Sequence, residues 1–185
     1  MPKPTYWTPQ QGRNNAVRVV GHPFEVWQDW QQTGTKWRCY SYKPSDPKPP
    51  SAKRGWIVPV ITDVDGGANV ALWHIGKMVF NDLTEYSNDP DYGDGKWEGL
   101  YQWEFIARKV QHSNFPVIKL RPYPNPSQSP VPLLTAQAQQ DLENDFWTNS
   151  QQQPMIVPPI IEQAKEPEPQ NNEKIQKILQ RMGYK

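Results

Sequence analysis

Cysteine and histidine are scarce in this chain. It has 185 residues but only one cysteine, Cys39, which excludes an intrachain disulfide framework and a multi-cysteine zinc site. The three histidines, His22, His74 and His112, are far apart in the sequence, and no Ser/His/Asp, Cys/His or phosphate-loop motif is present. We therefore expect no enzymatic activity, no metal and no other cofactor.

Long apolar segments and an excess of one charge are also missing. No stretch approaches the roughly 18 consecutive apolar residues of a membrane span, and residues 1–15 lack the apolar run of a secretory signal. We expect a cytoplasmic protein with no membrane partner. The net charge is +1 and the pI about 7.8, below the value of about 9 that is typical of duplex-DNA-binding domains. Nucleic-acid binding would therefore depend on the local arrangement of charges.

Proline and tryptophan, in contrast, are abundant. There are 21 prolines and 9 tryptophans, while the hydrophobic content is only 36%. This composition predicts a compact domain followed by a Pro/Gln-rich, partly disordered tail. The expected parts are an extended arm at 1–15, an OB-like barrel domain at 16–134, a Pro/Gln/Glu-rich linker with room for one short helix at 135–172, and an amphipathic terminal helix at 173–185.

The barrel domain has the residue pattern of a mainly β fold. Seven segments alternate or are rich in β-branched residues, and turn residues separate them. Residues 76–86 instead have apolar residues at helical spacing. We predict a small barrel of five to seven strands with one short helix, and Pro59 at an edge or a bulge because it lacks a backbone donor. The expected strands are 16–20, 24–30, 36–42, 56–62, 69–74, 101–110 and 116–121.

The strand at 36–42 has an informative alternation. Arg38, Tyr40 and Tyr42 point to one face, while Trp37 and Cys39 point to the other, where we expect the core. Aromatic rings and cations on one strand face are suited to bases and phosphates of a single strand. The alternative interpretation is that both tyrosines pack on a neighbouring strand and that the arginine is solvated.

Other cations and tryptophans extend this candidate surface. The Pro-rich loop 44–54 would form the lip of a phosphate groove, and the hairpin at 101–121 carries a group of four cations. The alternative is a solvated linker and an exposed rim, with some tryptophans inside the barrel. The candidate nucleic-acid-binding residues are Trp27, Lys36, Arg38, Tyr40, Tyr42, Lys43, Lys53, Arg54, Trp56, Trp73, Lys77, Arg108, Lys109, Lys119 and Arg121.

Acidic residues gather in two loops without forming a metal site. Asp63, Asp65 and Asn69 match part of a calcium-loop pattern, but its closing glutamate is absent. The loop 87–99 holds several aspartates with no histidine or glutamate at ligand spacing. We interpret both segments as turns.

The C-terminal segment is amphipathic. Ile175, Ile178, Leu179 and Met182 share one face of a predicted helix whose other positions are polar or basic. A lone helix of this length is marginally stable in water. We expect it to dock on a protein partner through these four residues.

Six short motifs follow one another between residues 14 and 134. In this order they resemble the OB-fold core of the single-stranded-DNA-binding proteins of T-even-like phages, without the zinc insertion found in that family. The resemblance implies an OB-fold and non-enzymatic binding of single-stranded DNA in replication, recombination or repair. The motifs are an N-x-x-R strand at 15–19, Pro23-Phe24, a Gly-Thr-Lys-Trp hairpin at 34–37, a Trp-containing apolar strand at 56–65, a Gly-Lys helix at 76–83 and Ser-Asn-Phe at 113–115.

Two departures from the family matter. Residues 44–54 occupy the region of the zinc insertion but contain no ligands, and the chain ends in a basic tip at Lys185 where the family has an acidic tail. Single-stranded DNA, with RNA as the alternative, is the expected ligand, in the host-cell cytoplasm for a phage protein. The second hypothesis is a structural or accessory subunit whose tail docks on a replication, transcription or virion assembly.

Overall fold

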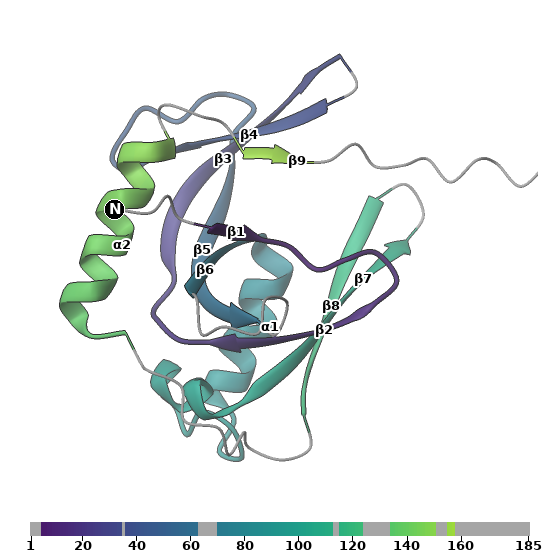
Figure 1. Ribbon diagram of the computed structural model, residues 1–185, viewed down its shortest axis with the longest axis vertical. Helices are drawn as coiled ribbons and strands as arrows, with labels where there is room; N and C mark the ends of the chain where they lie inside the picture. Colours follow the sequence, from purple (N-terminus) through teal and green to yellow (C-terminus); the bar gives the residue numbers. More distant parts are fainter. Residues whose placement is uncertain are drawn as a thin grey trace, which may run out of the picture.

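The protein has a mainly β fold, as its alternating segments predict. The computed structural model describes residues 5–34, 36–62, 70–112, 115–123, 134–150 and 155–157 (Figure 1). The strands are β1 (Thr5–Trp7), β2 (Asn14–Val19), β3 (Phe24–Thr33), β4 (Lys36–Tyr42), β5 (Lys53–Thr62), β6 (Val70–Ile75), β7 (Glu104–His112), β8 (Phe115–Pro122) and β9 (Met155–Val157). The helices are α1 (Lys77–Asn88), the 3-10 helix η2 (Trp97–Gln102) and α2 (Ala136–Ser150).

All nine strands belong to one strongly bent sheet. Its main path runs β8-β7-β2-β5-β3-β4-β9, and β6 branches from β5 and pairs with β1. Within the described residues no ladder joins β8 to β1, so the sheet is barrel-like but open. Seven of the strands are those that the sequence predicts, and β1 and β9 are short additions from the arm and the linker.

Strand β5 is the centre of the sheet. It pairs with β6 along one edge, and with β2 and then β3 along the other. The prediction that Pro59 lies at an edge or a bulge is wrong, because the residue lies in this central strand. Along this edge β5 pairs first with β3, up to Ile57, and then with β2, from Val60 onward, so Pro59 lies between the two ladders. The Pro59 carbonyl accepts a hydrogen bond of 3.0 Å from the Val20 N–H. A residue without a backbone donor is tolerated there because ladder pairing is already interrupted.

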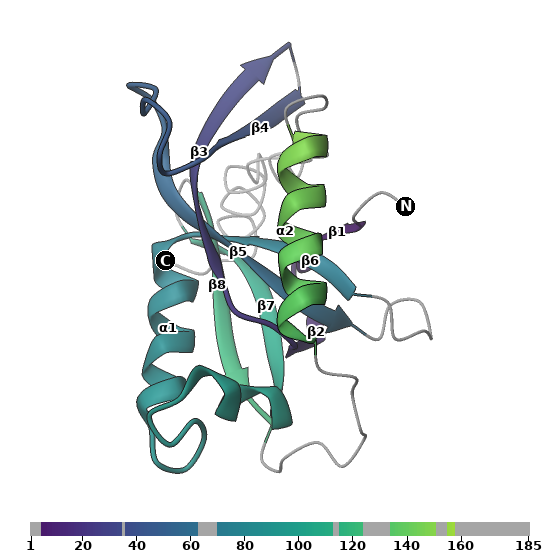
Figure 2. The same ribbon diagram turned by 90° about the vertical axis from the view of Figure 1, so that its left-hand side faces the viewer.

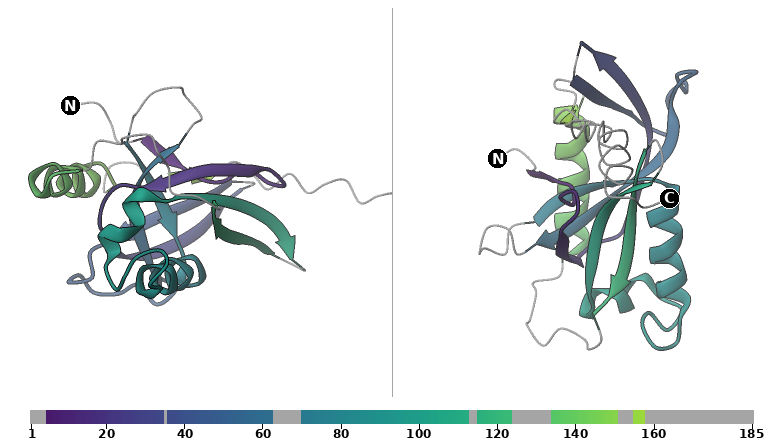
Figure 3. Two further views of the ribbon diagram at one scale, coloured as in Figure 1. Left: turned by 90° about the horizontal axis from the view of Figure 1, so that it is seen from below. Right: turned by 90° about the vertical axis from the view of Figure 1, so that its right-hand side faces the viewer.

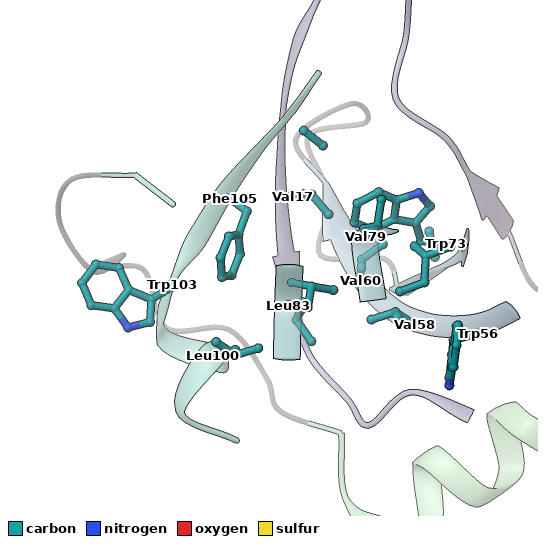
Figure 4. Packing of buried hydrophobic residues seen from close by; sticks show 14 residues of the cluster. Val17, Trp56, Val58, Val60, Trp73, Val79, Leu83, Leu100, Trp103 and Phe105 are labelled. Atoms are coloured by element: carbon teal, nitrogen blue, oxygen red, sulfur yellow. The ribbon is translucent and has the colours of Figure 1, made fainter. Parts of the chain in front are cut away.

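The first core lies between α1 and what we call the inner face of the sheet. Val17, Val58, Trp73 and Phe105 point into it, and helix α1 contributes residues such as Leu83 (Figure 4). Tyr101 and Trp103 were expected to continue the strand of Phe105. Residues 97–102 instead form η2, and β7 begins at Glu104.

Helix α2 covers part of the opposite, outer face. Its Phe146 is fully buried, with its ring centroid 5.3 Å from that of Phe24 and 5.9 Å from that of His74. Figure 2 shows the helix running along the sheet beside β6. Residues 136–150, which the sequence assigns to a linker, therefore belong to the packed unit. The predicted terminal helix at 173–185 and the turn at 63–69 lie outside the described residues.

Two hairpins extend from the body of the sheet as separate arms. One is β3–β4 and the other is β7–β8 (Figures 1 and 3). Because opposed residues of an antiparallel ladder share a face, the registers of these hairpins decide which side chains gather on each side.

Candidate nucleic-acid interface

Three strands bring the central candidate residues onto the inner face. Trp27 of β3 is paired with Tyr42 of β4 on one side and with Arg54 of β5 on the other. Further along the hairpin, Tyr40 is opposite Asp29 and Arg38 is opposite Gln31. The predicted alternation of β4 is therefore confirmed. We call the set of Trp27, Arg38, Tyr40, Tyr42 and Arg54 the hairpin face.

The residues of the hairpin face retain access to solvent. Trp27, Arg38, Tyr40 and Tyr42 are partly exposed, and the Arg54 side chain is 58% exposed. Arg54 donates a hydrogen bond to the carboxylate of Glu25, which raises the pKa of the guanidinium above its ordinary value. The guanidinium is thus held by Glu25 and over the ring of Trp56, while more than half of the side chain stays exposed to solvent.

Arg38 has an unmet hydrogen-bonding need. Its Nε is buried and has no hydrogen-bond partner among the described residues. A buried donor without a partner costs about 1–3 kcal/mol, and more on a charged group. The Arg38 side chain as a whole is still partly exposed, so its positive charge lies at the surface of the hairpin face.

The loop 43–52 folds onto the hairpin face. Lys48 Nζ lies 5.4 Å from the ring centroid of Trp27, and Ser51 Oγ donates a 2.7 Å hydrogen bond to buried Asp29. The other Asp29 oxygen accepts from Gln31 Nε2 at 2.6 Å. Asp29 therefore anchors the loop, and Lys48 supplies a cation above an aromatic ring.

Two tryptophans that were predicted to bind nucleic acid belong instead to the core, so the prediction is wrong for them. Trp73 is 1% exposed and lies within the first core, with its ring 5.0 Å from that of Trp7. Trp56 is 8% exposed because its ring stacks on Phe80 at 4.0 Å and Arg54 lies 5.4 Å over it. Neither ring offers a free surface to a base.

Several predicted cations lie away from the hairpin face. Lys53 is opposite Gln28, and both residues lie on the outer face of the sheet. Lys43 Nζ lies 5.7 Å from the centroid of the Trp147 ring in α2. Lys77 is exposed in the first turn of α1. The side chain of Lys36 lies outside the part of the chain that the structure describes.

The four cations of the β7–β8 hairpin are divided between two faces. Arg108 is opposite Lys119, and Arg121 follows on the same outer face. Lys109 is opposite Ile118, which packs against the first core, so Lys109 belongs to the inner face. The hairpin was expected to carry a group of four cations, but only three of them share one face.

The Cys39 thiol is buried on the outer side of β4. Burial raises the pKa of the Cys39 thiol to about 12, so it is protonated at neutral pH. In the described ranges no group of three or more His, Cys, Asp or Glu side chains could hold a metal ion. No helix in this part of the chain is long and apolar enough to cross a membrane.

The sequence interpretation overlooked how two loop residues complete the site. Lys48 lies in the loop that was predicted to form the lip of a phosphate groove but was not among the candidate residues, and Ser51 was not considered. The spacing of cations in a Pro-rich loop is a signal that a loop can reach a groove, but it does not say which residue meets which ring. That pairing depends on the three-dimensional path of residues 43–52.

Comparisons of the chain with family models, curated proteins and solved structures found no match. The resemblance to phage single-stranded-DNA-binding proteins therefore remains a prediction from the order of the sequence motifs.

Proposed function

We propose that the chain binds single-stranded nucleic acid, with DNA as the preferred form, on the hairpin face. Three partly exposed rings, Trp27, Tyr40 and Tyr42, provide stacking surfaces for successive bases. Arg38, Arg54 and Lys48 supply the positive charge for the backbone. The observation that carries the proposal is that the register of β3 and β4 gathers three partly exposed rings and the Arg38 side chain on one face of the sheet.

The binding mode follows from the chemistry of these groups. Stacking contributes about 1–3 kcal/mol per base, so the three rings together with phosphate contacts would give useful affinity. Lys48 has to move from the face of Trp27 when a base stacks there, and it then becomes free to contact a phosphate. Because few cations take part, the dependence of affinity on salt is modest compared with that of a strongly basic protein.

A titration of a labelled oligo-dT at several salt concentrations tests the proposal. We expect saturable binding at low salt that weakens as salt increases, and little binding to duplex DNA of the same length, whose bases are not free to stack. An oligo-rU titrated in parallel distinguishes DNA from RNA. No binding to any single strand at low salt would contradict the proposal.

The second candidate function is that of an accessory subunit without nucleic-acid binding. It is supported by the net charge of only +1 over 185 residues, which gives little general attraction for polyanions. In this case a protein partner would bind the C-terminal segment, and its predicted docking residues lie outside the described ranges. A complete absence of a gel shift with oligo-dT at low salt would favour this candidate.

A further inference from the structure

A second row of cations lies on the outer face of the β7–β8 hairpin. Lys119 and Arg121 are two residues apart on β8 and point to the same outer face, and Tyr123, directly after the strand, follows at the same spacing. Arg108 of β7 is directly opposite Lys119. All four side chains are exposed, and Tyr123, at 37%, is one of three exposed large hydrophobic residues in the described part of the chain. We call Arg108, Lys119, Arg121 and Tyr123 the outer row.

The cations of the outer row, Arg108, Lys119 and Arg121, have no ion-pair partner in the described part of the chain. Arg18, on the same face, differs: it is 7% exposed and donates a hydrogen bond to the Tyr101 carbonyl. Like charges directly opposite each other on a ladder destabilise it. The arrangement is therefore unfavourable in isolation and becomes favourable beside a polyanion.

The geometry of the row matches an extended polymer. Alternate residues on a strand are about 6.6–6.8 Å apart, roughly twice the rise per nucleotide in B-form DNA. Lys119 and Arg121 thus form a short, regular line of positive charge, with Arg108 beside it and one aromatic ring at its end. Two or three backbone phosphates and one stacked base would occupy this line.

The outer row and the hairpin face are on opposite faces of the sheet. Leu120, between Lys119 and Arg121, packs with the first core on the inner face. Trp56 and Val58, which also belong to that core, alternate along β5 with Arg54 and therefore share its face. Trp27 is opposite Arg54 on β3, so the hairpin face is on this inner side as well. Figure 3 shows the two hairpins as separate arms. A short strand stacked on one face does not reach the other without passing an edge of the sheet.

We infer that the outer row is a second binding site for a nucleic-acid backbone, so that one molecule holds two strands at once. The inference rests on the proposed function for the site on the hairpin face. The two sites differ in character: the hairpin face has three rings, whereas the outer row has three cations and one ring. The first site binds mainly through bases, and the second mainly through phosphates, so the second is more sensitive to salt.

Bridging of two labelled oligonucleotides tests this inference. One short oligo-dT carries a donor dye and another an acceptor, and energy transfer is followed as protein is added. We expect transfer to rise at substoichiometric protein and to fall at excess protein, when each oligonucleotide has its own molecule. Sedimentation at the maximum should give the mass of one chain with two oligonucleotides. A mass of two chains, or no transfer at all, overturns the inference.

Variants assign the bridging to the outer row. R108A/K119A/R121A should reduce the transfer by about fivefold or more while the tighter of the two binding events changes by less than about threefold. K43A/K53A/K96A removes the same charge from exposed positions outside both sites and should leave bridging nearly intact. Equal losses in the two variants would mean that general charge, not the outer row, is responsible.

Two further results separate the possible failures. Binding of one oligo-dT that is sensitive to changes in Tyr40 and Tyr42, without bridging, refutes the second site and keeps the proposed function. Absence of any oligo-dT binding refutes both. Polyglutamate is also tested as a competitor at the second site. If it competes as effectively as oligo-dT, the partner of the outer row is an acidic protein segment, and nucleic acid is overturned as that partner.

Discussion

Trp27 and Trp56 occupy the same face of the sheet on neighbouring strands, but their surroundings differ. Trp56 is stacked on Phe80 of α1 and covered by Arg54, whereas Trp27 is partly exposed and has the ammonium group of Lys48 5.4 Å from its ring centroid. Helix α1 packs on one half of the inner face, and the β3–β4 half is left without a helix and is met by the loop 43–52. One sheet face thus serves as a core where a helix covers it and as a candidate interface where none does.

The largest expected difference between the two halves is in stability. Trp73→Ala removes a side chain that is 1% exposed in the first core and should destabilise the fold by about 3–5 kcal/mol. Trp27→Ala, on the uncovered half, should change the free energy of unfolding by about 1 kcal/mol or less. Urea unfolding followed by circular dichroism measures both, and similar effects of the two substitutions would remove the distinction.

The next expected difference is in ligand binding. Tyr40→Ala combined with Tyr42→Ala should weaken binding of oligo-dT by more than about tenfold, because two stacking surfaces are lost. The fold should survive, since both rings are partly exposed. Anisotropy titration of a labelled oligo-dT gives the change, and circular dichroism verifies the fold. Unchanged affinity would exclude β4 as a stacking platform.

The covered half of the outer face should respond to acid. His74 lies between Gln28, Tyr6 and Phe146, and burial lowers its pKa from 6.5 to about 4. Above pH 6.5 the imidazole is neutral in both states; between pH 6.5 and about 4 only the unfolded chain takes up the proton. Stability should therefore fall over this window, by roughly 1–3 kcal/mol.

Unfolding curves of the wild type and of His74→Gln at several pH values test this effect. The substituted chain should lose most of the extra pH dependence between pH 6.5 and about 4, whatever its stability at neutral pH. An unchanged slope in the variant would assign the acid sensitivity to other groups.

The smallest expected effect concerns cations outside the hairpin face. Lys43→Ala with Lys53→Ala should weaken oligo-dT binding by less than about threefold, because the structure places both side chains away from that face. A loss comparable to that of the tyrosine variant, in the same titration, would show that the ligand crosses to the outer side of β5.

Local patterns predicted much of this fold. The seven long strands, the alternation of β4 and the burial of Cys39 follow from a period of two, which neighbouring residues determine by themselves. Which face of β4 lies on the side of the first core was not predicted, because Arg38, Tyr40 and Tyr42 lie on that side and Cys39 on the other. The helix at 77–88 follows in the same way from its own spacing of apolar residues.

Features that depend on distant contacts were not predictable from such patterns. Whether Trp56 or Trp27 is covered depends on the position of α1, which follows both in the sequence. The docking of Phe146 depends on Phe24, more than a hundred residues earlier. The strands β1 and β9 have three residues each, too few to show a period, and they form by pairing with the existing edges of β6 and β4.

Quenching of tryptophan fluorescence by oligo-dT tests most directly whether the uncovered half of the inner face binds a single strand. Trp27→Phe is compared with Trp30→Phe, a change on the same strand at a residue that is 39% exposed but faces outward. A base stacked at the hairpin face should quench the wild type and the Trp30 variant alike, and should lose most of this quenching in the Trp27 variant. Equal quenching in the wild type and the Trp27 variant would contradict the account.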